Sequence, residues 1–260
     1  MDLAPAAAAL GIGLIAHDEI DSTNAEALRL AGAGERGLLW VTARSQSAGR
    51  GRRGRPWVSG PGNLYATLLV SDPSPPELAP QLSFLAALAL HDALVMVAPV
   101  IGPRLDLKWP NDMLCDGAKM AGILVEGEGT RPLSTAIGVG VNCTQHPENA
   151  DYPATDLAAA GVSVTPEQLF RALSAAMVLR LQQWDRGKSF GAIRADWLAR
   201  SSGLDREIRV RLAEREVTGR FESLDAAGRL ILRVPSGGTE TISAGDVMPL
   251  HAGSPPDRDP

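Results

Sequence analysis

The sequence of 260 residues has only two cysteines and no long apolar run, and these absences exclude several classes of protein. Cys115 and Cys143 are too few for a disulfide scaffold or a cysteine-rich zinc module. No uninterrupted apolar run reaches the roughly 18 residues that a membrane-spanning helix needs, so we expect no membrane partner. The four histidines lie far apart in the sequence, so no histidine-based metal motif is present.

A secretion signal is also lacking at the N-terminus. The apolar stretch of residues 6–16 has no basic residue ahead of it, and Gly11 and Gly13 interrupt it. We therefore expect a short helix that leads into a strand, in a protein of the reducing cytoplasm. Hydrophobic residues make up 45% of the chain and charged residues 21%, which is enough apolar material for a packed core and excludes a disordered protein.

Acidic residues are absent from residues 36–71, although the whole chain has a net charge of −5. Removing the six positive charges of this window leaves −11 for the rest of the chain. An acidic chain is a poor general ligand for nucleic acids. The window therefore indicates either a solvated basic loop or a pocket for a small polyanion. Its six arginines are Arg36, Arg44, Arg50, Arg52, Arg53 and Arg55.

The first 203 residues alternate between predicted strands and predicted helices. Thr23 and Glu26 have the spacing of a capping box, which predicts that Thr23 caps an early helix. The nearly all-apolar residues 81–98 predict a buried helix. Asp116-Gly117 is a strong turn signal, so the residues around it are expected to form a β-hairpin. Thr165-Pro166-Glu167-Gln168 predicts a capped helix start.

The pattern changes after Gly203. Short alternating strands separated by turn residues follow from Glu207, which is typical of a small β-barrel. We therefore expect a catalytic or binding domain over residues 1–203 and a β domain over residues 204–252. Residues 253–260 are predicted to be a disordered tail.

Three short segments with cationic side chains stand out as candidates for binding or catalysis. Gln46-Ser47-Ala48-Gly49-Arg50-Gly51-Arg52-Arg53-Gly54-Arg55 allows backbone amides and guanidinium groups to approach one anionic ligand together. It is not a phosphate-binding P-loop, because no Gly-Lys-Ser/Thr ending and no predicted helix follow. The other two segments are Lys108-Trp109-Pro110-Asn111-Asp112 and Lys119-Met120-Ala121-Gly122-Ile123-Leu124.

With Ser22-Thr23-Asn24 and Ile137-Gly138-Val139-Gly140-Val141-Asn142, these segments resemble the ordered motifs of biotin–protein ligases over nearly the whole chain. The resemblance implies an α+β, mixed-sheet catalytic domain of the class II synthetase-like, biotin–lipoate ligase type, followed by a small SH3-like β-barrel. It implies that biotin and ATP, with Mg²⁺, form biotinyl-5′-AMP. The biotinyl group then passes to a lysine of a biotin carboxyl carrier domain of a carboxylase.

The resemblance also implies roles for individual residues. Lys119 and Arg52 are the expected catalytic residues, with Lys119 between the biotin carboxylate and the α-phosphate. No protein side chain is expected to be a dedicated metal ligand. The expected biotin contacts are Ser22, Thr23, Asn24, Gln46, Arg50, Gly51, Arg52, Lys119 and Gly122. The expected ATP or adenylate contacts are Arg50, Arg52, Arg55, Trp57, Lys108, Asn111, Lys119 and Asn142.

Structural roles compete with several of these assignments. Ser22 to Asn24 could simply cap the following helix, and Lys119 could be a hairpin lysine that points into water. Trp57 is either a lid over the adenylate or a packing residue. Asp112 shapes a turn, braces Lys119 or helps to hold Mg²⁺.

Two other functions compete with the ligase. A lipoate or octanoate ligase or transferase would share the fold, but it needs an apolar tunnel rather than polar partners for a ureido ring. A nucleic-acid-binding protein could use the Arg-Gly loop. The net charge argues against it, and Ser22 lies too near the start for the N-terminal DNA-binding domain of some relatives, so no nucleic-acid partner is expected.

Overall fold

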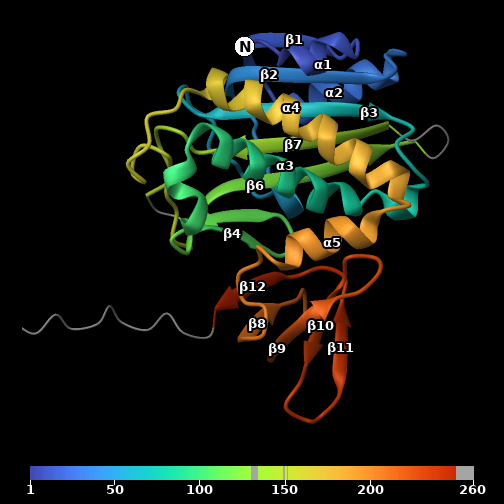
Figure 1. The fold of residues 1–260 in the computed structure, drawn as a ribbon, viewed down its shortest axis with the longest axis vertical. Helices are drawn as coiled ribbons and strands as arrows, with labels where there is room; N and C mark the ends of the chain where they lie inside the picture. The colour runs from blue at the N-terminus through green and yellow to red at the C-terminus, as the bar shows by residue number, and fades with distance from the viewer. Residues whose placement is uncertain (130–133, 149, 151, 250–260) are drawn as a thin grey trace, which may run out of the picture.

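The computed structural model describes residues 1–129, 134–148, 150 and 152–249 and contains two β-sheets (Figure 1). The larger sheet has seven strands in the order β1-β2-β3-β7-β6-β5-β4, of which only β1 and β2 pair in parallel. This is the mixed sheet that the resemblance implied. Its strands are β1 (Gly13–Ile20), β2 (Leu38–Gln46), β3 (Leu64–Ser71), β4 (Leu105–Lys108), β5 (Asp112–Cys115), β6 (Ala118–Glu128) and β7 (Ser134–Val141).

Helices cover both faces of this sheet. The main hydrophobic core lies between one face and the helices α3 (Gln81–Val97) and α4 (Pro166–Trp184), which cross it side by side in Figure 1. A smaller core lies on the opposite face under α2 (Thr23–Gly32). Because both faces are covered, β3 is buried along almost its whole length, which explains its nearly continuous apolar sequence. The short α1 (Pro5–Ala9) and α5 (Phe190–Leu198) complete the α-helices of the described residues.

Local sequence signals account for the starts of α2 and α4. α3 matches the expected buried helix, and the predicted capping box of α4 is confirmed, with both the Thr165 and Gln168 side chains engaged. The predicted cap of α2 was wrong by one residue. Ser22 caps this helix by accepting a hydrogen bond from the backbone N–H of Ala25, which leaves the Thr23 hydroxyl free for other contacts. No described helix is both long and apolar enough to cross a membrane.

The predicted β-hairpin is confirmed as β5 and β6. Asp116 and Gly117 both have positive φ, 50° and 78°, as the two central residues of a tight I′-type turn require. A register shift between Met113 and Leu114 interrupts the pairing, so that Asp112 lies opposite Gly122. The hairpin thereby brings Asp112 and Lys119 to the same side of the sheet.

A second sheet follows α5 and lies beyond the β4 edge of the first sheet (Figure 1). Its five antiparallel strands have the order β11-β10-β9-β8-β12 and form the small barrel-like unit expected from the sequence. The Trp109 indole N–H joins the two sheets by donating to the Gly228 carbonyl at 3.1 Å. The expected tail, residues 253–260, lies outside the described residues. The strands are β8 (Glu207–Arg211), β9 (Glu216–Leu224), β10 (Leu230–Arg233), β11 (Thr239–Ile242) and β12 (Asp246–Pro249).

Candidate active site

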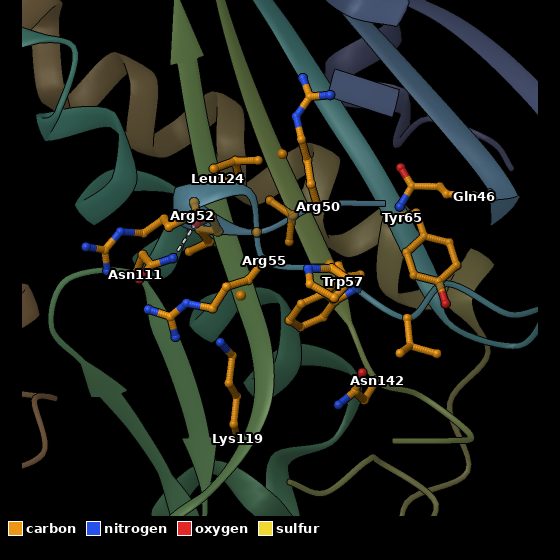
Figure 2. A pocket seen from close by; sticks show the side chains of 18 of the residues that line it. Gln46, Arg50, Arg52, Arg55, Trp57, Tyr65, Asn111, Lys119, Leu124 and Asn142 are labelled. Carbon is orange, nitrogen blue, oxygen red and sulfur yellow. Dashed lines mark hydrogen bonds between the residues drawn. The ribbon is translucent and has the colours of Figure 1, made fainter. Parts of the chain in front are cut away.

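A cavity of about 410 Å³ brings together most of the residues that the sequence singled out. Its walls come from the start of α2, the arginine-rich loop after β2, the strands β6 and β7, and the segment after β7. Figure 2 shows Gln46 and Tyr65 at one end of the cavity, Arg52, Asn111 and Lys119 at the other, and Trp57 between them. Thirteen of the fourteen expected contact residues line it, and Lys108 is the exception.

Neutral polar side chains form the end of the cavity nearest α2. The Gln46 side-chain oxygen accepts from the Thr23 backbone N–H at 2.8 Å and from the Thr23 hydroxyl at 3.1 Å. The Gln46 amide nitrogen donates to the Ser59 hydroxyl at 2.9 Å, which fixes the orientation of the amide. The Thr67 hydroxyl lies 2.8 Å from the Thr23 hydroxyl and 2.7 Å from the Asn24 side-chain oxygen. This network presents fixed donors and acceptors to a neutral polar ligand.

Glycines of β6 and β7 form the floor of the cavity. A Cβ at Gly138 would lie 2.2 Å from the Asn24 side-chain oxygen, so no larger residue fits there. The Trp57 indole packs over the other two glycines, and a Cβ would lie 2.7 Å from it at Gly140 and 3.1 Å at Gly122. The Trp57 indole nitrogen is buried and has no hydrogen-bond partner among the described residues. Trp57 therefore packs on the floor of the cavity, with its indole nitrogen against Gly140.

Lys119 is held inside the cavity rather than pointing into water. Its side chain is only 17% exposed, and its ammonium lies 2.7 Å from an Asp112 carboxylate oxygen. The ammonium also lies 5.4 Å from the centre of the Trp57 ring and 5.1 Å from that of Tyr152, within cation–π range. Asp112 therefore braces Lys119. The cation is fixed where a carboxylate and a phosphate could both reach it.

The arginine-rich loop, residues 49–56, forms the rim of the cavity. An internal hydrogen bond from Gly51 N–H to the Arg55 carbonyl closes the loop on itself. The Arg52 guanidinium donates to the Asn111 side-chain oxygen at 3.0 Å and to the Gly245 carbonyl at 3.3 Å. Burial lowers the pKa of Arg52 from its usual value. An arginine retains its charge after such a shift, so Arg52 remains available to an anion.

Two of the expected ATP or adenylate contacts, Lys108 and Asn142, have surroundings that the sequence did not predict. Lys108 is half-buried outside the cavity lining, and burial, with Lys119 nearby, lowers its pKa. Asn142 lines the cavity, but its side-chain amide nitrogen donates to the Thr155 carbonyl at 3.0 Å. The Lys119 backbone N–H donates to the Pro153 carbonyl on the same segment. Asn142 thus holds this part of the wall in place.

Several residues of the site were missed by sequence reasoning, among them Thr67, Tyr65 and Asp246. Thr67 is a polar residue within the apolar run of β3, and that irregularity is a signal that could have identified it. Tyr65, on the same strand, lines the cavity, and burial raises its pKa to about 12. Asp246 reaches the rim from the second sheet, and no local motif marks it.

The two cysteines take no part in the site. Cys115 and Cys143 are both buried, and neither lines the cavity. Burial raises the pKa of Cys115 and raises that of Cys143 to about 12, so neither is a ready nucleophile. They are core residues that take no part in the chemistry of the site.

Known proteins match the chain over most of its length. Residues 18–142 match the Biotin/lipoate A/B protein ligase family, and residues 203–248 match the Biotin protein ligase C terminal domain. The chain is 44% identical to the biotin–[acetyl-CoA-carboxylase] ligase of Paracoccus denitrificans, over 88% of this chain and 97% of that protein. It is 36% identical to the Mycobacterium tuberculosis protein of the same name, over 88% and 86% of the two chains.

A solved structure extends this similarity to the fold. The biotin protein ligase of Aquifex aeolicus, in complex with biotin and ATP, superposes with a TM-score of 0.76 at 26% identity, over 91% of this chain and 97% of that chain. The matches cover both sheets and the motifs that line the cavity. The chain belongs to the biotin protein ligase family.

Proposed function

We propose that the chain attaches biotin to a lysine of a biotin carboxyl carrier domain in two ATP-dependent steps. The observation that carries this proposal is the arrangement of the cavity. A neutral network around Thr23 and Gln46 suits the ureido ring of biotin, and the guanidinium of Arg52 suits a phosphate. The ammonium of Lys119 lies 5.4 Å from the centre of the Trp57 ring, which is placed between the two ends, so we assign the reaction of the two substrates to this position.

The first step joins two anions. A biotin carboxylate oxygen attacks the α-phosphorus of ATP, the bond to the bridging oxygen breaks, and pyrophosphate leaves with that electron pair. The product is biotinyl-5′-AMP. Lys119 reduces the repulsion between carboxylate and phosphate, and Arg52 stabilises the charge that develops on the phosphate oxygens. Both cations are largely shielded from water, with side chains 17% and 23% exposed, which strengthens their effect.

The second step transfers the biotinyl group. The neutral ε-amine of the carrier lysine attacks the acyl carbon, AMP leaves with the electron pair of the broken C–O bond, and the amine loses a proton. An acyl-adenylate is already activated, so this step depends on holding its carbonyl within reach of the amine. The fixed Thr23–Gln46 contacts at the biotin end provide that positioning.

Mg²⁺ belongs to the proposal as a companion of ATP. Within the described part of the chain, no group of three histidine, cysteine, aspartate or glutamate residues has the geometry of a metal site. Asp246 lines the cavity, but arginines surround it, and the nearby Asp112 pairs with Lys119. These two carboxylates therefore do not form a metal-binding site, and we assign Mg²⁺ to the phosphates of ATP.

The organisation of the chain follows from the same proposal. We assign residues 1–203 to a catalytic domain and residues 204–252 to a C-terminal β domain, which is supported by the two separate sheets. Because the first step consumes ATP, which is abundant in the cytoplasm, we place the enzyme there.

Intact mass of a carrier domain tests the proposal. Incubation with the chain, ATP, Mg²⁺ and biotin should add one biotinyl group, and a carrier whose acceptor lysine is replaced by arginine should remain unmodified. A parallel reaction with lipoate or octanoate tests the related acyl ligases. Modification by lipoate and none by biotin would reject the assignment.

A further inference from the structure

Asp246, at the start of β12, lies among three guanidinium groups of the arginine-rich loop. Its carboxylate oxygens lie 3.4 Å from Arg53 and 3.9 Å from Arg52, and it also forms a close ion pair with Arg55. The preceding carbonyl, that of Gly245, accepts a further hydrogen bond from Arg52 at 3.3 Å. One short segment of the second sheet therefore contacts three arginines on the rim of a cavity built mainly from the first sheet.

The loop needs such a partner because its own charges repel one another. Four arginines occur within the six residues from Arg50 to Arg55, with no acidic residue between them. The backbone bonds of the loop are largely internal, from Gly51 to Arg55 and from Trp57 to Gly49. Such bonds shape the loop but do not attach it to the rest of the site. Its attachment depends on side-chain contacts, among them Arg50 with Glu126 at 3.3 Å.

The backbone under Asp246 is fixed, so its carboxylate can act as an anchor. In the β8–β12 pairing, Asp246 lies opposite Arg211, but the Arg211 guanidinium pairs with Glu216 at 3.0 Å instead. A Cβ at Gly245 would lie 2.6 Å from the Val210 side chain, so the chain enters β12 pressed against β8. Asp246 thus remains available to the loop on a rigid support.

We propose that Asp246 is a positioning residue that holds the arginine-rich loop over the nucleotide end of the cavity. The second sheet then completes the active site, although it contributes no catalytic residue. Asp246 acts through Arg52 and Arg55, the two of its three arginine partners that line the cavity with it. The part of this inference that concerns ATP rests on the proposed function, whereas the part that concerns the loop does not.

Limited digestion of the ligand-free chain by trypsin tests the loop. Trypsin cleaves after arginine, so its cleavage rate between Arg50 and Arg55 reports how firmly the loop is held. Asp246→Asn should raise that rate about tenfold, because the charge-assisted contacts of one carboxylate are lost together. Asp246→Glu, which keeps the charge, should restore most of the protection. Glu240→Gln is the matched control, since it breaks an ion pair with Arg215 on the same sheet, away from the cavity.

A double-mutant comparison assigns the effect to the ion pairs. Arg53 contacts Asp246 but does not line the cavity, so Arg53→Gln should raise the cleavage rate severalfold in the natural chain, measured at the remaining arginines. In the Asp246→Asn background the same substitution should change the rate little. Full additivity of the two effects, or equal cleavage of Asp246→Asn and the natural chain, would overturn the proposal.

ATP–pyrophosphate exchange tests the consequence for catalysis. Asp246→Asn should raise KM for ATP about tenfold, and kcat and the Kd for biotin should change less than threefold, because the contacts of the loop with phosphate are weakened first. An unchanged or lower KM for ATP would reject the positioning role, even if trypsin cleavage increased. Absence of exchange in the natural chain would reject the proposed function instead and leave the trypsin result valid.

Discussion

The two ends of the cavity are built in opposite ways. At the biotin end, Thr23 and Asn24 are each 4% exposed and lie in a network of mainly neutral hydrogen bonds, to which the Glu126 carboxylate adds one contact by accepting from the Asn24 amide at 2.8 Å. At the nucleotide end, the side chains of Arg53 and Arg55 are 40% and 52% exposed, and ion pairs with another sheet hold them. The first end is supported by the core of the larger sheet, and the second by contacts that salt and solvent can weaken.

This difference matches what each end would recognise under the proposed function. A neutral ring is selected by donors and acceptors that are already oriented, because an unpaired buried polar group costs about 1–3 kcal/mol. A polyphosphate arrives charged and leaves as pyrophosphate and AMP. Exposed arginines can exchange their protein partners for phosphates and return to them, because each exposed ion pair contributes only about 0–1 kcal/mol to stability. Lys119 resembles neither the neutral residues of one end nor the exposed arginines of the other, because it is charged and also enclosed.

Replacing Lys119 should therefore have the largest effect. Lys119→Ala removes the enclosed cation and should slow ATP–pyrophosphate exchange by about 10²–10³-fold, the usual cost of losing one preorganised electrostatic group. The Kd for biotin, measured by calorimetry, should stay within about tenfold, because the Thr23–Gln46 contacts remain. Exchange at the natural rate would remove Lys119 from the mechanism.

Arg52→Gly should have the next largest effect, confined to the nucleotide end. A charge-assisted hydrogen bond is worth about 1.5–3 kcal/mol, so the dissociation rate of biotinyl-5′-AMP should rise by about 10–100-fold. Arg52 touches Asn111 and Gly245 rather than the hydrophobic core, so the melting temperature should fall by only a few degrees. A large loss of stability with unchanged retention of the adenylate would make Arg52 a structural residue.

The biotin end should respond to Thr67→Val. This substitution keeps the shape but removes the hydroxyl that contacts Thr23 and Asn24, so the Kd for biotin should rise about fivefold. Neither KM for ATP nor the salt dependence of biotin binding should change. Thr42→Val is the matched control, because its buried hydroxyl has no hydrogen-bond partner in the described chain. Equal weakening by both variants would show that core packing, not the network, determines biotin affinity.

The sequence predicted the cavity residues well where a short motif carries them. The segments around Gln46, Asn111 and Lys119 fold as local loops and hairpins, so their neighbours in sequence are also their neighbours in space. Thr67 and Asp246 reach the site through long-range pairing, beside Gly138 of β7 and opposite Arg211 of β8, which no local pattern encodes. Lys108 belongs to a recognised motif but lies outside the cavity lining. The alternation of β4 directs Leu107 into the core and Lys108 away from it.

The smallest expected effect concerns a charged pair that lies beside the biotin end but outside the cavity. Arg29 donates two hydrogen bonds of 2.8 Å to Asp21 and lowers the pKa of that carboxyl from 3.8 to about 2. A lowered pKa stabilises the folded state above pH 3.8, and this contribution is lost as the pH falls from 3.8 toward 2. Asp21→Asn should lower the melting temperature slightly at pH 7, and the two melting curves should converge near pH 2. Because both side chains are about half exposed, at 47% and 52%, the difference at pH 7 should shrink in high salt, while biotin affinity stays the same. A marked loss of biotin affinity in this variant would show that the neutral network depends on a surface charge, and the contrast between the two ends of the cavity would then fail.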